Sequence, residues 1–305
     1  MTAVTTQRQV DDRGRTGRFP TAGPVRSRAL TKLTRRLPGR LLTLVLLIAV
    51  IYPLVWLFLG SLKSQSDYLN SPSYSLPAHW MWGNYKDAWV TGNLGTYIRN
   101  SVTAVLPALA LVILLGSAAG FALQVMKWRL SRTVMLLFLA GIMVPSQMIL
   151  LPLFTIYFQA GLTGSLWPLI ITYTATGLPL TVFMLATYFR AVPREVIESA
   201  AIDGAGIFRV FFSIALPMVR NAILTVALVQ FFFMWNDLLV ALTFTNSNNL
   251  RTVQVGLLNF TGEFGSIQYG PLFAAICITV FGTLVLFVAL NRQVMKGLTG
   301  GAVKG

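Results

Sequence analysis

The chain has 305 residues, of which 55% are hydrophobic and only 11% are charged, and its formal net charge is +15. Soluble domains carry about 25% charged residues, so this composition excludes an ordinary globular protein and predicts an all-α integral membrane protein. With one His and one Cys, the chain has no disulfide framework and too few ligands for a catalytic metal site, so we expect no metal. The basic residues lie between apolar segments, which argues against a nucleic-acid-binding face.

Residues 1–40 form the first region. They contain ten Lys or Arg, two Asp and no apolar periodicity, which predicts a disordered basic tail. A targeting peptide is the alternative interpretation. The apolar segment that follows is too long for a signal sequence and no small-residue cleavage site comes after it, so we expect it to be retained as an anchor.

Six apolar segments follow, each with the roughly 20 residues that a membrane-spanning helix requires. They cover residues 41–62, 97–126, 133–158, 166–189, 221–245 and 271–290. Together they predict a transmembrane domain at residues 41–291, followed by a C-terminal tail at 292–305. Prolines inside several segments predict kinks, because the proline ring removes a backbone hydrogen bond.

The distribution of Lys and Arg predicts the topology, because cytoplasmic loops are enriched in both. With six spans, the N-terminal region, the 126–132 loop, the 190–220 loop and the C-terminal tail share one side and hold 20 of the 24 Lys and Arg residues. We therefore expect both termini and the 190–220 loop to be cytoplasmic. The 63–96 loop is then extracytoplasmic, and its tryptophans are typical of the lipid headgroup level.

The cytoplasmic stretch at 190–220 is the most polar part of the apolar region. Pro193 suits the first turn of a helix, and Glu195 and Glu198 suit its positive end. Asp203-Gly204 predicts a turn, since glycine adopts positive φ without strain. An amphipathic helix follows and is expected to end at Pro217. The residue chemistry leaves two interpretations open, an interfacial helix pair and a docking element for a soluble partner.

The spacing within this stretch resembles the EAA loop of ABC importer permeases. Glu-Ser-Ala, three residues, Gly, nine residues and Ile-Ala-Leu-Pro match that loop, with Ser199 as a small-for-small departure. Further short motifs resemble the carbohydrate-uptake branch, and specifically its MalG-like subunits: Tyr52-Pro53, Asn84-Tyr85, Asn100-Ser101, Pro145-Ser146-Gln147, Trp235-Asn236-Asp237 and the end of the chain from Gly297 to Gly305. Residues 1–40 have no counterpart in the resemblance.

The resemblance implies a type I ABC importer-like fold of six transmembrane helices in the cytoplasmic membrane. It implies coupling to an ATP-hydrolysing subunit dimer through Glu198, Ser199, Ala200, Asp203, Gly204, Ile214 and Pro217, with Gly301 and Lys304 in a tail that reaches toward the same dimer. The further partners would be a MalF-like sister permease and an extracytoplasmic sugar-binding protein. The chain has no GxxxxGK[ST] phosphate loop, so it is expected not to be an enzyme. ATP and Mg would bind in the partner, and no cofactor is expected here.

Asp237 is the only acidic residue inside an expected span, and intramembrane carboxylates usually face a cavity or a partner. We consider it, with Asn236 and Gln147, as a candidate for the translocation path. Solvation near the outer interface is the alternative for Asp237, and a cross-helix hydrogen bond is the alternative for a buried Gln such as Gln230. Asp237 is also the one residue that supports an ion-coupled secondary transporter. The scarcity of His, Cys and paired acids argues against a membrane-embedded enzyme.

Overall fold

The computed structural model describes residues 27–126, 128–261 and 267–300. The chain divides into two units, Met1–Leu54 and Val55–Gly305. Within the described residues all regular secondary structure is helical, and one isolated bridge joins Thr261 to Ile267. The predicted all-α class is confirmed.

Helix α1 (Ser27–Ser61) contains the first apolar segment, and its residues 39–61 are long and apolar enough to cross a membrane. The candidate span agrees closely with the apolar segment expected at 41–62, although the helix itself already begins at Ser27. Residues 28–37 are rich in Ala, Leu, Lys and Arg, which are strong helix formers, and they extend the helix ahead of the span. Residues 1–26 of the predicted disordered tail lie outside the described part of the chain.

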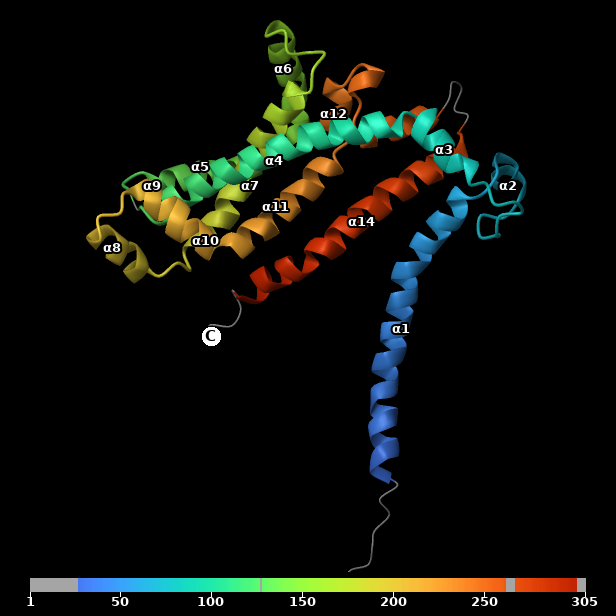
Figure 1. The fold of residues 1–305 in the computed structure, drawn as a ribbon, viewed down its shortest axis with the longest axis horizontal. Helices are drawn as coiled ribbons and strands as arrows, with labels where there is room; N and C mark the ends of the chain where they lie inside the picture. Colours follow the sequence, from blue (N-terminus) through green and yellow to red (C-terminus); the bar gives the residue numbers. More distant parts are fainter. Residues whose placement is uncertain (1–26, 127, 262–266, 301–305) are drawn as a thin grey trace, which may run out of the picture. The chain divides into compact units, whose positions relative to one another are not determined.

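Helices α4 (Leu94–Gln124) and α7 (Trp167–Phe189) form the central pair of the second unit. A Cβ added to Gly120 of α4 would lie 2.9 Å from the backbone nitrogen of Ala186 on α7. Glycine therefore permits an approach that any larger residue would prevent, as is common between membrane helices. Figure 1 shows this pair with α11 and α14 beside it.

The third apolar segment is not one continuous helix. It forms α5 (Ser131–Ile142) and α6 (Ser146–Gln159), which meet at 95°. The break falls just before Pro145, the N-cap residue of α6, because proline cannot supply the N–H that would continue α5. The expected kink at Pro145 is thus a complete interruption, whereas Pro152 lies inside α6.

The fifth segment is also broken, so the expected single span at 221–245 is wrong. Helix α11 (Arg220–Trp235) ends before Asn236, and α12 (Leu239–Phe244) is a separate short helix. On the other side, Ile207–Met218 and Arg220–Trp235 meet at 77°. Counting each bent pair as one span gives up to six spans, and four helices pass the length and apolarity test individually among the described residues.

The last helix, α14 (Tyr269–Gly300), continues beyond the sixth apolar segment. Residues 292–300 of the predicted tail are therefore helical, and the first part of this tail, residues 292–296, contains no glycine. Residues 301–305, which include Gly301 and Lys304, lie outside the described residues. Their expected contact with a partner stays a prediction.

Short helices occupy the end of the second unit opposite to the 190–220 stretch (Figure 1). They are α2 (Gln65–Asn70), α3 (Gly83–Val90), α13 (Val253–Gly256) and the 3₁₀ helices η2 (Asn248–Leu250) and η3 (Leu257–Phe260). A cluster of buried side chains, including Leu94, Tyr97, Val253 and Phe260, holds this end together. The tryptophans of the 63–96 loop remain exposed there: Trp80, Trp82 and Trp89.

Candidate coupling surface and polar sites

The 190–220 stretch folds as helix, turn and helix, as predicted. Helix α8 (Arg194–Ile202) begins directly after Pro193, which is its N-cap residue. Asp203 caps the C-terminus, and Gly204 follows with φ of +77°. The N–H of Gly204 donates to the Ala201 carbonyl at 3.1 Å and that of Ala205 to the Ala200 carbonyl at 2.9 Å. This is a Schellman arrangement, which requires the glycine.

The second helix of the stretch is continuous but locally underwound. It consists of α9 (Ile207–Val210), a π-helical turn (Phe211–Ala215) and α10 (Leu216–Met218). Pro217 lies inside α10, and the chain changes direction at Val219. π-Helical turns often occur at functional sites. This one turns Phe211 inward, while its neighbour Phe212 is exposed.

The inner face of the stretch is packed against the long helices. Phe211 lies 5.2 Å from Phe121 of α4, and Phe121 lies 5.7 Å from Phe189 of α7, measured between ring centroids. Ala200 and Ala215 belong to the same buried cluster. One close-packed cluster therefore joins α8 and α9 to α4 and α7.

The outer face exposes large apolar side chains on both sides of the glycine turn. Ile202 is 86% exposed and Phe208 is 77% exposed. Glu198, Ser199, Asp203 and Gly204 are exposed on the same stretch. We call these six residues the coupling surface. Of the other three predicted coupling residues, Ile214 is half-buried, Pro217 is exposed and Ala200 is buried.

Asp237 lies in the break between α11 and α12 and not inside a helix. Its carboxylate accepts a hydrogen bond from the Tyr173 hydroxyl at 3.0 Å and from the Ala241 N–H, also at 3.0 Å. The carboxylate thus satisfies the start of α12 and links it to α7. These bonds give Asp237 a structural role.

The other candidates for a translocation path do not gather around Asp237. Asn236 is exposed and donates to the Phe232 carbonyl, and Gln147 is exposed in the first turn of α6. Gln230, in contrast, is buried and donates to Thr181 Oγ1 at 2.9 Å and to the Gly177 carbonyl at 3.1 Å. The predicted cross-helix bond of Gln230 is confirmed.

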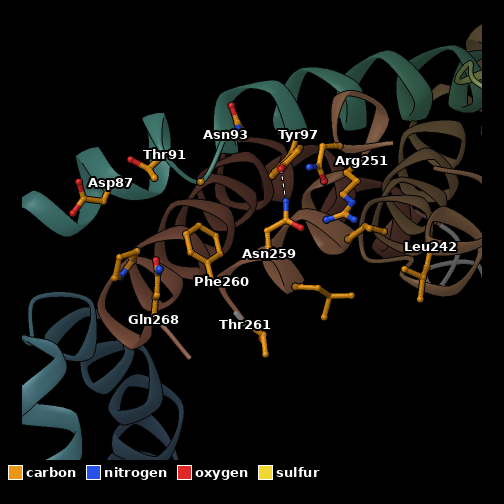
Figure 2. Close-up of a pocket in the computed structure, with 15 residues that line it drawn as sticks. Asp87, Thr91, Asn93, Tyr97, Leu242, Arg251, Asn259, Phe260, Thr261 and Gln268 are labelled. Atoms are coloured by element: carbon orange, nitrogen blue, oxygen red, sulfur yellow. Dashed lines mark hydrogen bonds between the residues drawn. The ribbon is translucent and has the colours of Figure 1, made fainter. Parts of the chain in front are cut away.

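A polar pocket of about 1050 Å³ opens at the end opposite to the coupling surface. In Figure 2, Asp87, Thr91 and Asn93 lie on one side of it, and Arg251, Asn259 and Gln268 lie on the other. Asn259 donates to the Tyr97 hydroxyl. Arg251 Nε is buried and has no hydrogen-bond partner among the residues that the structure describes.

The loop that carries Arg251 is fixed to α4 by two side chains. Asn100 Nδ2 donates to the carbonyls of Asn249 at 2.7 Å and Arg251 at 3.0 Å. Ser101 Oγ accepts the Val253 N–H at 2.9 Å. Our sequence analysis missed this pocket, although the Asn100-Ser101 pair was a signal for it. In the described part of the chain, no group of three His, Cys, Asp or Glu could hold a metal ion.

Comparison with known proteins identifies the family. Residues 112–294 match the model of the binding-protein-dependent transport system inner membrane component. The chain belongs to this family. The matched region contains the coupling surface, α11 and most of α14, so membership rests on the elements described above and confirms the resemblance to ABC importer permeases.

Relatives of this inner membrane component match over nearly their whole length. The diacetylchitobiose uptake system permease protein NgcG of Streptomyces coelicolor is 36% identical over 84% of this chain and 85% of the relative. The melibiose/raffinose/stachyose import permease protein MelC of Bacillus subtilis is 30% identical over 87% of this chain and 95% of the relative. A crystal structure of a bacterial ABC transporter involved in the import of the acidic polysaccharide alginate contains a similar chain, with a TM-score of 0.73 and 16% identity over 89% of this chain and 99% of that one. At that identity the similarity establishes the fold alone.

Proposed function

We propose that this inner membrane component is a permease subunit of an ATP-driven sugar importer, and that di- or oligosaccharides are its substrates. Two kinds of observation support the substrate class. The relatives NgcG and MelC are named for the uptake of diacetylchitobiose and of melibiose, raffinose and stachyose. The polar pocket at the end opposite to the coupling surface, which we call the outer pocket, presents amide, hydroxyl, carboxylate and guanidinium groups. These groups suit a ligand rich in hydroxyl groups.

The coupling surface is the observation on which the proposal chiefly depends. Exposed apolar side chains next to a tight turn favour docking to a soluble protein over a purely interfacial role. Ile202 and Phe208 would fill a cleft of an ATP-hydrolysing subunit, Glu198 would face basic groups, and Gly204 would permit close backbone approach. Movement of that subunit would reach the spans through Phe211, Phe121 and Phe189.

The remaining parts of the importer are also proposals. The pore would form with a MalF-like sister permease, and an extracytoplasmic binding protein would deliver the sugar to the outer end. Both termini would be cytoplasmic, as the bias of 20 of 24 Lys and Arg residues indicates. Hydrolysis, with its ATP and Mg, would belong to the partner subunit, so this chain would need no cofactor and would catalyse no reaction.

Two substitutions in the purified complex test the proposal. Gly204→Val forces a branched residue into φ of +77°, and Glu198→Lys reverses the charge of an exposed residue on α8. Gly161→Val is the matched backbone control, since Gly161 has φ of +67° in the loop before α7. Glu195→Lys is the matched charge control on the same helix.

The measurements are co-purification of the ATPase and ligand-stimulated ATP hydrolysis, with size-exclusion chromatography as the folding check. We expect the amount of co-purified ATPase and the rate of ligand-stimulated ATP hydrolysis to fall in Gly204→Val and Glu198→Lys and to persist in the two controls. If the ATPase stays bound and stimulated in Gly204→Val, the stretch is only an interfacial helix pair and the proposal fails.

A further inference from the structure

A second pocket lies beside the coupling surface and is not explained by docking or by sugar transport. It has a volume of about 430 Å³ and lies among the C-terminal ends of α4 and α7 and the beginning of α5. Its polar lining includes Gln124, Ser131, Arg132 and Arg190. None of the residues that line it is acidic, so its electrostatic character is positive.

The position of Arg132 indicates what the pocket accepts. Arg132 is in the first turn of α5, where the helix dipole already places positive charge and a cation is unfavourable. The Ser131 N–H donates to the Trp128 carbonyl at 3.1 Å, but no side chain caps that end of α5. Arg190, the C-cap residue of α7, adds a second guanidinium. An anion is the ligand that would relieve this arrangement.

Apart from Thr187, the remaining residues that line the pocket are apolar. Leu136 is 56% exposed and Phe183 is 43% exposed, and both line the pocket on the side of the spans. A free phosphate would leave these surfaces unused. A ligand that carries a phosphate at one end and a hydrocarbon chain at the other would contact both parts.

We infer that this pocket binds an anionic phospholipid of the cytoplasmic leaflet, with the phosphate at Arg132 and Arg190 and an acyl chain along Leu136 and Phe183. The inference rests on the cytoplasmic orientation proposed above but not on the identity of the sugar. Anionic headgroups are concentrated in that leaflet and attract basic residues near the membrane surface.

The bound lipid would hold the joint between the spans and the coupling surface. Arg190 ends α7, and α8 begins at Arg194. A smaller cavity of about 270 Å³ shares Gln124 and Arg190 with the lipid pocket and extends to Arg194 and Glu198. Occupancy of the lipid pocket would therefore restrict the movement of α8 relative to α7.

The test uses the full chain in detergent and native mass spectrometry. Phosphatidylglycerol and phosphatidylcholine with identical acyl chains are titrated separately. The double variant Arg132→Gln/Arg190→Gln removes both guanidinium groups. Arg129→Gln/Arg209→Gln is the charge-matched control, because neither residue lines the pocket. Thr187→Trp fills the pocket without changing the charge, since the exposed Thr187 lines its wall.

We expect the wild type to bind phosphatidylglycerol at least tenfold more tightly than phosphatidylcholine, because each contact between a basic residue and an anionic lipid strengthens binding by roughly fivefold to tenfold. The control variant should show the same preference. The double variant and Thr187→Trp should both lose this preference, and inorganic phosphate should not displace the lipid. Equal retention in all variants would overturn the inference. Displacement of the lipid by inorganic phosphate would also overturn it, because that would indicate a simple anion site. Loss of the preference when the sister permease is present would overturn it too, because that would indicate that protein covers the pocket.

Discussion

The hydroxyl of Tyr173 on α7 donates to the carboxylate of Asp237 at 3.0 Å, and this bond connects α7 to the break between α11 and α12. Tyr173→Phe removes one hydrogen bond to a charged group and should lower stability by about 1.5–3 kcal/mol. Asp237→Ala should cost more, because the Ala241 N–H also loses its acceptor. Asp237→Asn should retain most of the stability. Thermal unfolding of the purified chain in detergent measures all three.

The same series distinguishes a structural Asp237 from an ion-coupling one. If Asp237 carried protons or ions, Asp237→Asn would abolish transport although the protein remained folded. We expect uptake and ATP hydrolysis of Asp237→Asn to stay within a few-fold of the wild type. A folded but inactive Asp237→Asn would contradict the structural role.

The exposed side chains of the coupling surface should contribute to binding and not to folding. Ile202→Ser and Phe208→Ser should change the free energy of unfolding by no more than about 0.5 kcal/mol, because both residues are largely exposed. Burial of each side chain against a partner is worth about 1.5–3 kcal/mol, so ATPase affinity should fall by roughly tenfold to a hundredfold for each. Binding of the purified ATPase to the immobilised wild type and variants measures this change in affinity. Unchanged affinity with both residues replaced would argue that the coupling surface lies elsewhere.

The approach of α4 to α7 at Gly120 should tolerate no side chain. Gly120→Ala places a Cβ 2.9 Å from the Ala186 nitrogen and 3.3 Å from the Leu185 carbonyl carbon, and both are backbone atoms that cannot move independently of α7. We expect a loss of about 1–3 kcal/mol from overpacking. The control is Gly282→Ala on α14, where nothing lies within 4 Å of the added Cβ. The control should be unchanged or stabilised by up to about 1 kcal/mol, and equal melting temperatures for the two variants would refute the packing argument.

Asn100 should be essential to the shape of the outer pocket. Asn100→Ala leaves the carbonyls of Asn249 and Arg251 without their donor and should cost about 1–3 kcal/mol. Asn236→Ala is the control, because the exposed Asn236 side chain donates only to the Phe232 carbonyl of its own helix and accepts one long bond, at 3.5 Å, from Gln254 Nε2. It should shift stability by about 0.5 kcal/mol or less. Melting temperatures in detergent compare the two, and a larger effect at Asn236 would contradict the assignment.

The capping box of α2 predicts a pH dependence. The pKa of Asp67 lies below its ordinary value of 3.8, chiefly because its carboxylate accepts a hydrogen bond from the Ser64 N–H. Desolvation raises the pKa, and the hydrogen bond with the Ser64 side chain lowers it further. Because the folded-state pKa is the lower one, the stabilisation is fully present above pH 3.8 and is lost as the pH falls through the folded value. The wild type should therefore have a higher melting temperature than Asp67→Asn at neutral pH, and the difference should shrink as the pH falls below 3.8. A difference that persists in acid would show that charge is not involved.

The sequence by itself determined the class of protein, the approximate positions of the apolar segments and the helix, turn and helix at 190–220. These features are local: hydrophobic length sets a span, and Asp203-Gly204 sets a Schellman turn at φ of +77°. The interruption before Pro145 follows from the missing N–H of proline, which is a local feature. Tertiary structure decided the interruption at Asp237, where the Tyr173 bond stabilises the break between α11 and α12. It also decided which exposed residues converge, since Arg251, Asn259 and Asp87 meet in one pocket from segments far apart in the chain. Burial pattern and hydropathy encode the depth of a residue in the membrane, whereas contacts between distant segments depend on how whole helices pack.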